Sequence, residues 1–238
     1  MRVGQIPSAG TGRAPVTAVL LRSLLPRVWR ILPWKALAAA GGLGLLLAGS
    51  ARWTEQAPGE DSGLVLLRLT ALTGALGLAY VLDDPARHTT VTSPLGRPLR
   101  TGLRLALVAP LAALWWTAAL LLLPDATRPP LGRTTLEAAA MATCALALAT
   151  VTVRFTDGPK AGRPAAIWLG VAAALAALIP DRWGLTAAPW DPWGEATQLR
   201  WAVVLGVTTL ASMACTAEPL RRRSGMRGWF GAYPAQCG

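Results

Sequence analysis

The sequence predicts an all-α, polytopic membrane protein with six transmembrane helices, both termini in the cytoplasm and an interfacial helix ahead of the first span. Three observations lead to this prediction. Apolar residues gather in six runs of roughly 17–22 residues, the length that a helix needs to cross a bilayer. Hydrophobic residues make up 53% of the chain and charged residues only 15%. The connections between the runs alternate between basic and acidic or mixed charge.

Each run must form a helix, because the hydrocarbon core offers no hydrogen-bond partner to an exposed backbone group. The runs also lack the alternating pattern of an outer-membrane barrel. We therefore assign residues 34–218 to one six-helix transmembrane domain. In chain order the predicted spans are Trp34–Ala51, Gly63–Leu82, Gly102–Leu123, Thr134–Phe155, Pro164–Pro180 and Arg200–Ala217.

Two segments of different character precede the first span. Residues 1–14 are rich in Gly, Ser, Pro and Thr and are expected to form a disordered arm. Residues 15–33 mix apolar and basic residues and predict a helix at the cytoplasmic interface, although Pro26 should kink it. A cleaved signal peptide is the competing interpretation of the first span, but the basic region ahead of that span is longer than a signal peptide has.

The net charge of +11 is concentrated in the N-terminal segment up to Lys35, the second and fourth connections and the basic tail at residues 219–238. By the positive-inside rule these four segments are cytoplasmic, which requires an even number of spans. Only the third connection, with Asp125, Arg128 and Arg133, opposes this arrangement weakly. The basic face should attract anionic lipid, whereas no basic soluble domain is present to bind nucleic acid. Alanine- and arginine-rich composition with little lysine suggests a bacterial source, and hence the bacterial cytoplasmic (inner) membrane.

Residue types that carry catalysis are sparse. His88 is the one histidine in the sequence, and no second histidine or cysteine beside it completes a metal site. Cys144 and Cys215 lie within predicted spans and Cys237 in the tail, without a C-x-x-C motif. No G-x-x-x-x-G-K-[ST] motif for ATP binding occurs. We predict no catalytic residue, no metal ligand and no cofactor bound by this chain.

The second connection predicts a short cytoplasmic helix. Asp84 suits the N-cap and Pro85 the first helical position, and Pro94 would end the helix after about Thr92. The adjacent carboxylates of Asp83 and Asp84 point apart and do not form a paired metal motif. Two interpretations stay open: a capped turn without a partner, or a docking element for a cytoplasmic protein.

Arg68 and Glu137 are the clear ionisable residues inside predicted spans. A charge at the bilayer centre costs roughly 2.5–3.5 kcal/mol, so such residues usually have a partner or reach the interface. If the second and fourth spans both run inward, the two residues lie at similar depth in the outer leaflet. They either form an ion pair or reach the interface separately. In the fifth connection, Trp183, Trp190 and Trp193 predict an outer-interface segment or re-entrant turn, serving as an aromatic belt or as a substrate gate.

Together these features resemble the permease subunit of ABC-2-type exporters. Leu82-Asp83-Asp84-Pro85-Ala86, then Pro94, Arg97, Pro98, Arg100 and Arg104 leading into a span with Trp115-Trp116, is similar to actinobacterial membrane proteins found beside ABC ATPases. The resemblance implies export driven by a separate cytoplasmic ATPase, which would bind ATP and Mg, and a membrane part that is a homodimer or heterodimer of permease chains. It also implies a partner-coupling segment that includes Asp83, Asp84, Pro85, Arg87, Arg97 and Arg100.

An alternative function belongs to a different class. The chain could be a non-transporting accessory, regulatory or immunity-type membrane protein whose basic cytoplasmic face recruits a partner. A membrane enzyme ranks third, because no catalytic set is visible in the sequence. A neighbouring gene for an ATPase without spans of its own would favour the permease.

Overall fold

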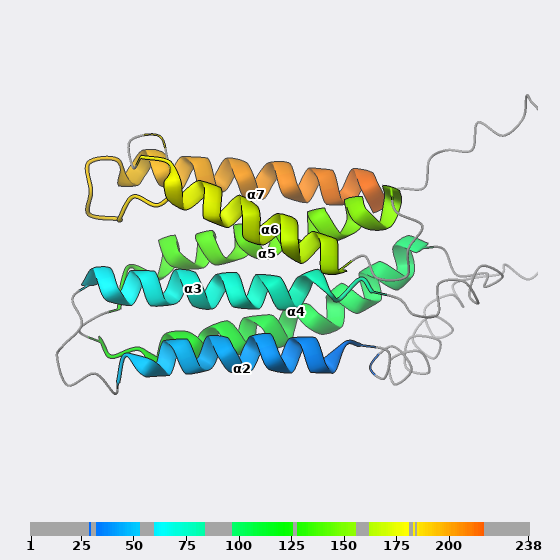
Figure 1. Cartoon of the computed structure of the whole chain (residues 1–238), viewed down its shortest axis with the longest axis horizontal. Coiled ribbons are helices and arrows are strands. Elements are labelled where there is room, and N and C mark those ends of the chain that lie inside the picture. Colours follow the sequence, from blue (N-terminus) through cyan, green and yellow to red (C-terminus); the bar gives the residue numbers. More distant parts are fainter. Residues whose placement is uncertain are drawn as a thin grey trace, which may run out of the picture.

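All regular structure in the described part of the chain is helical (Figure 1). The computed structural model describes residues 29, 32–52, 60–83, 97–125, 128–155, 162–180, 183 and 185–216. The all-α prediction is confirmed for these residues. The six helices are α2 (Trp34–Ser50), α3 (Glu60–Ala79), α4 (Arg97–Leu122), α5 (Leu131–Phe155), α6 (Gly162–Leu178) and α7 (Gly194–Thr216).

Several predicted segments lie outside the described residues. These are the N-terminal arm at residues 1–14, the basic tail at residues 219–238 and most of the interfacial helix predicted at residues 15–33. Of that helix only Trp29, Leu32 and Pro33 are described. The Trp29 and Trp34 rings lie 4.3 Å apart between centroids, and the Trp34 indole donates a hydrogen bond to the Trp29 carbonyl oxygen.

The helices run up and down in one bundle (Figure 1). α2, α4 and α6 begin at the end of the bundle where α3, α5 and α7 finish. The start of α2 and the end of α7 therefore lie at the same end. This arrangement makes α3 and α5 parallel to each other, so residues at matching depth on both helices can meet across their interface.

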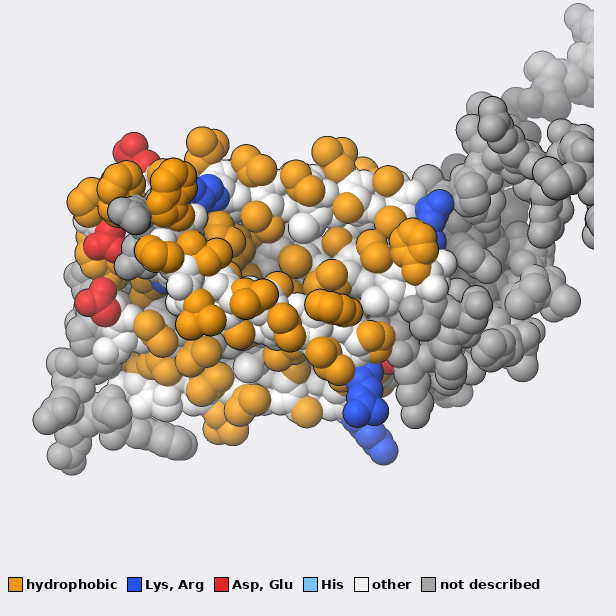
Figure 2. All heavy atoms as spheres, turned by 45° about the horizontal axis from the view of Figure 1, so that its top comes forward, with side chains coloured by type: hydrophobic (Ala, Val, Ile, Leu, Met, Phe, Trp, Pro, Cys, Tyr) orange, Lys and Arg blue, Asp and Glu red, His pale blue; other side chains and the backbone are white. Residues whose placement is uncertain are grey.

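Within the described residues, four helices are long and apolar enough to cross a membrane. These segments are Asp61–Ala79, Thr101–Leu122, Leu131–Phe155 and Gly194–Cys215. The helices α2 and α6 are also apolar but have 17 residues each. Apolar side chains cover the middle of the face in Figure 2, and charged side chains lie toward its ends. The chain therefore has the helices of a multi-pass membrane protein.

Some helix ends differ from the predicted spans. The helix α3 covers Glu60–Ala79 where the apolar run suggested Gly63–Leu82, and α7 begins at Gly194 where we expected Arg200. The helix α4 begins at Arg97 and not at Gly102, so Arg97 and Arg100 are helical residues and not part of a loop. The helices continue beyond the apolar runs because polar residues such as Gln198 and Arg100 are themselves good helix formers.

Small residues bring the helices close together inside the bundle. The helix α5 packs against α3, α6 and α7, and α2 packs against α3. In membranes, where lipid is as apolar as leucine, close approach of backbones through small residues supplies much of the packing energy. One cluster of buried residues, between α3, α5 and α6, consists of Ala75, Ala79, Ala145, Ala149, Ala165 and Leu169.

Trp115 of α4 fits into a recess of glycines on α2 and α3. Its indole nitrogen donates a 2.9 Å hydrogen bond to the Gly41 carbonyl oxygen. A Cβ atom at Gly44 would lie 2.5 Å from the Trp115 ring, and one at Gly74 would lie 2.6 Å from it. The ring therefore occupies volume that only glycine leaves open at these two positions, and it attaches α4 to the α2–α3 pair.

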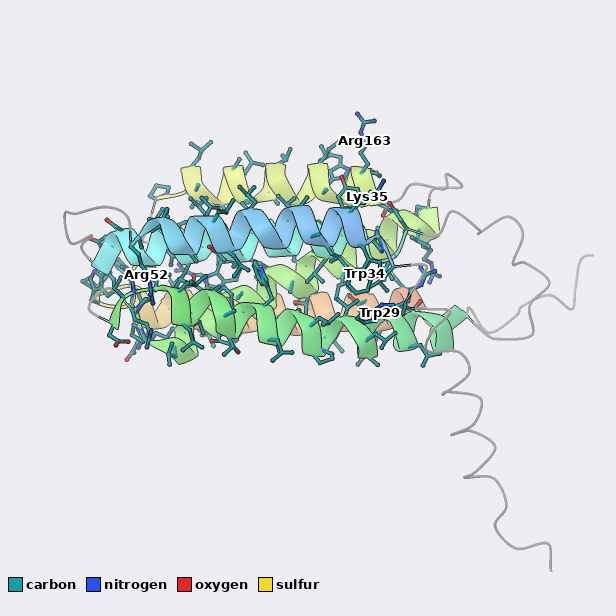
Figure 3. The ribbon with its side chains drawn as sticks, turned by 90° about the horizontal axis from the view of Figure 1, so that it is seen from below. Trp29, Trp34, Lys35, Arg52 and Arg163 are labelled. Atoms are coloured by element: carbon teal, nitrogen blue, oxygen red, sulfur yellow. The ribbon has the colours of Figure 1, made fainter. Side chains whose placement is uncertain are left out.

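Charge differs between the two ends of the bundle. Where α2, α4 and α6 begin, the described charged side chains are Lys35, Arg104, Arg154 and Arg163, with Asp83 as the acidic exception. We call this the basic end. Figure 3 shows Lys35 and Arg163 at the basic end and Arg52 at the other. The opposite end carries both signs, with acidic side chains prominent where α3 and α7 begin (Figure 2).

Candidate functional site

Arg68 of α3 and Glu137 of α5 form an ion pair inside the bundle. The Arg68 Nε lies 2.8 Å from Glu137 Oε2, and Nη2 donates a second hydrogen bond of 3.1 Å to Oε1. The side chains are 17% and 8% exposed. Two parallel N–H···O bonds hold the planar guanidinium and the carboxylate in a fixed relative orientation. Of the two interpretations of Arg68 and Glu137, the structure contains the ion pair and not two side chains that reach the interface separately.

The same guanidinium also binds the chain between α6 and α7. Arg68 Nη1 donates to the Thr186 carbonyl oxygen at 2.6 Å, and Nη2 donates to the Ala187 carbonyl oxygen at 3.1 Å. All three guanidinium nitrogens therefore have acceptors. One side chain thus joins α3, α5 and the α6–α7 connection, which the sequence did not predict.

Further contacts hold residues 185–191 against the bundle. Arg133 of α5 donates to the Pro189 carbonyl oxygen at 2.8 Å, and the Trp201 indole of α7 donates to the Leu185 carbonyl oxygen at 3.0 Å. The carboxylate of Asp191 accepts a hydrogen bond from the Ala188 backbone N–H at 2.8 Å. Side chains of three helices, α3, α5 and α7, therefore bind backbone carbonyl oxygens of this segment.

The pair lies deeper along its helices than the predicted spans implied. The helix α3 begins at Glu60 and α5 at Leu131, so Arg68 and Glu137 are eight and six residues from their helix starts. At 1.5 Å per residue these positions are about 12 Å and 9 Å along the two axes. The similar depths, predicted from the sequence, allow the side chains to meet across parallel helices.

The tryptophans of the fifth connection are exposed. Trp183, Trp190 and Trp193 all present much of their surface outside the bundle. Exposed indoles near the ends of apolar helices are typical of the aromatic belt at a membrane interface. Trp201, in contrast, is buried and belongs to the contacts that hold residues 185–191.

The predicted coupling segment is described only at its two ends. Asp84, Pro85 and Arg87 lie outside the described residues, as does His88, while Arg97 and Arg100 belong to the first turns of α4. The short helix predicted from Asp84 to Thr92 therefore stays a prediction.

Asp83, at the N-terminal side of this segment, has an intramolecular partner. Its Oδ1 atom accepts a 2.6 Å hydrogen bond from the backbone N–H of Gly162, the first residue of α6. The carboxylate therefore satisfies an N–H group that has no partner within α6 and lies near the positive end of the helix dipole. Arg104 of α4 donates a longer 3.4 Å hydrogen bond to the Asp83 carbonyl oxygen. Asp83 connects the end of α3 to the starts of α4 and α6.

The described residues contain no group of three or more His, Cys, Asp or Glu side chains that could hold a metal ion. Cys144 and Cys215 are free thiols. Within the bundle, Arg68 neutralises the charge of Glu137 and binds the backbone carbonyl oxygens of Thr186 and Ala187.

Comparison of the chain with protein families, curated proteins and solved structures gives no match.

Proposed function

We propose that this chain is the membrane-spanning permease subunit of an ATP-driven exporter of the ABC-2 type. In this proposal all six helices cross the bacterial cytoplasmic membrane and both termini lie in the cytoplasm. A separate cytoplasmic ATPase binds ATP and Mg and hydrolyses the ATP. Two permease chains, alike or different, surround the substrate path, and the basic end lies against anionic lipid.

The observation that carries this proposal is the distribution of charge on an up-and-down bundle. Lys35, Arg104, and the pair Arg154 and Arg163 come from three regions that are distant in sequence, and the alternating helix directions bring them to one end. Positive charge is typical of the cytoplasmic side of such proteins. Although α2 and α6 have only 17 residues, that length is within the range of transmembrane helices.

The position of the coupling segment agrees with this orientation. The segment joins the end of α3 to the start of α4, at the basic end, where a cytoplasmic ATPase would reach it. The hydrogen bond from the Gly162 N–H to the Asp83 carboxylate also connects the start of this segment to α6. A movement of the segment would therefore be passed directly to three helices, as a transmission element between an ATPase and a membrane domain requires.

The test is co-purification in detergent with an ATPase that is encoded beside this chain and carries the G-x-x-x-x-G-K-[ST] motif. We expect the wild-type chain to retain that ATPase and stimulate its activity. The double variant Arg97→Glu with Arg100→Glu, and separately Asp84→Ala, should weaken both effects while the membrane domain stays folded.

A control variant distinguishes loss of ATPase docking from a general loss of positive charge at the basic end. Lys35→Glu with Arg163→Glu makes the same change of charge at exposed residues of the basic end, outside the coupling segment. This control should retain the ATPase. Unchanged association and activity in every segment variant, or the absence of any associated ATPase, would contradict the permease proposal and favour the accessory, regulatory or immunity-type membrane protein.

A further inference from the structure

A small cavity lies beside the Arg68–Glu137 pair, between α5 and the first turns of α7. Its volume is about 10 Å³, and its lining includes Arg133 and Glu137 from α5 and Thr197 and Gln198 from α7. This volume is at the lower limit of what one water molecule needs. A hydrated ion or an organic molecule would be too large.

Thr197 has a buried hydroxyl group with no hydrogen-bond partner among the described atoms. The residue is 2% exposed. Other helical threonines satisfy their hydroxyls locally: Thr150 donates to the Ala147 carbonyl oxygen, and Thr209 donates to that of Leu205. A buried hydroxyl without a partner is costly, and in native proteins an ordered water usually supplies the missing bond.

Glu137 offers the second partner that a bound water needs. Arg68 donates one hydrogen bond to each carboxylate oxygen, and an ionised carboxylate has about four acceptor positions, so acceptor positions remain. The charge of Glu137 is already matched by Arg68, and Arg133 adds a second positive group to the lining. The cavity therefore suits a neutral ligand and not a cation.

We propose that this cavity binds one water molecule, which hydrogen-bonds to the Thr197 hydroxyl and the Glu137 carboxylate. The water joins α7 to the ion pair of α3 and α5, next to the segment that Arg68 and Arg133 hold. This inference is independent of transport, since it concerns how the polar centre is completed within one chain.

The test compares Thr197→Val, which has the same shape without the hydroxyl, with Thr197→Ser and with Thr150→Val in detergent. If water bridges the site, Thr197→Val should lower the unfolding temperature by about 2–4 °C, as expected for the loss of one buried hydrogen bond. Thr197→Ser should keep most of the wild-type value. Thr150→Val, whose hydroxyl bonds only within its own helix, should have a smaller effect.

A second measurement detects the water itself. Radiolytic hydroxyl-radical labelling marks side chains beside bound water, so Trp201 should be labelled in the wild type although it is only 8% exposed, and labelled less in Thr197→Val. An unfolding temperature of Thr197→Val equal to or above the wild-type value would overturn the proposal. So would an absence of Trp201 labelling in the wild type, which decides the question even if the variant cannot be purified.

Discussion

The Nε atom of Arg68 lies 2.8 Å from Oε2 of Glu137, although the two residues are 69 positions apart in the sequence. The contact crosses the interface between two parallel helices, α3 and α5. Arg68 makes two further bonds to Thr186 and Ala187, whereas within the described part of the chain Glu137 is bound by Arg68 alone. Arg68 therefore has more hydrogen-bond partners than Glu137, and its replacement should destabilise the protein more.

Neutral replacements of the pair should show strong coupling. Glu137→Gln leaves a buried guanidinium without its counter-charge, at a cost on the order of 3 kcal/mol for a buried pair. Arg68→Met should cost more, because the carbonyls of Thr186 and Ala187 lose their donors as well. The double variant should be more stable than Arg68→Met. Thermal unfolding in detergent of all four proteins measures the coupling.

The ion pair of Asp125 and Arg128, at the surface of the bundle, provides the control. The Asp125 side chain is 90% exposed, so Asp125→Asn should change stability by about 1 kcal/mol or less. Additive effects of Arg68→Met and Glu137→Gln would contradict a functional ion pair inside the bundle.

Gly44→Ala should destabilise the protein, whereas Gly42→Ala should not. The new methyl group at position 44 would lie 2.5 Å from the Trp115 ring, while nothing lies within 4 Å of the one at position 42. Both residues are inside α2, so both variants gain similar helix propensity, about 1 kcal/mol. Overpacking typically costs about 1–3 kcal/mol, which outweighs that gain only at position 44.

Unfolding temperatures of the two glycine variants give the comparison. Adding Trp115→Phe to Gly44→Ala should recover part of the loss, since the smaller ring leaves room for the methyl group. Equal stability of Gly42→Ala and Gly44→Ala would show that the ring does not occupy this recess.

Asp83→Ala should loosen the start of α6. It removes the acceptor for the Gly162 N–H and should cost about 1 kcal/mol, as the loss of a helix N-cap does. Asp83→Asn keeps an oxygen acceptor at the same place and should stay close to wild type. Amide hydrogen exchange over residues 162–166 checks this, with faster exchange expected in Asp83→Ala alone. Equally fast exchange in both variants would assign the effect to the lost charge and not to the lost hydrogen-bond acceptor.

Both ends of the chain should lie in the cytoplasm. A reporter enzyme that is active only outside the cytoplasm should be inactive when fused after Cys237. The same reporter should be active when inserted between Arg52 and Glu60, in the connection from α2 to α3. Activity of the fusion after Cys237 would reject the proposed orientation.

The sequence predicted the helices well, because each is an apolar run long enough to stand out from its neighbours. It was less accurate at the ends of the helices. Gly194 begins α7 six residues ahead of Arg200, since the intervening polar residues carry no hydrophobic signal yet continue the helix. The limits of an apolar run mark the hydrocarbon region, while the limits of a helix depend on backbone hydrogen bonds and caps.

The ion pair could be suggested from matched depth, but its other partners could not. The bonds from Arg68 to Thr186 and Ala187 end on backbone carbonyls, which look the same at every position of a sequence. The Asp83 bond to Gly162 likewise depends on which helix starts beside the end of α3. Such contacts follow from the tertiary arrangement, and short-range patterns contain no record of them.

The Trp115 recess has a consequence for how this sequence can vary over evolution. Positions 44, 74 and 115 lie on three helices yet share one volume, since the ring occupies the place of two absent methyl groups. A larger residue at position 44 or 74 should be accepted in a homologue only together with a smaller one at position 115. These three positions should therefore change together, and an alignment of relatives that shows tryptophan at 115 beside alanine at 44 or 74 would imply a different spacing between α2, α3 and α4.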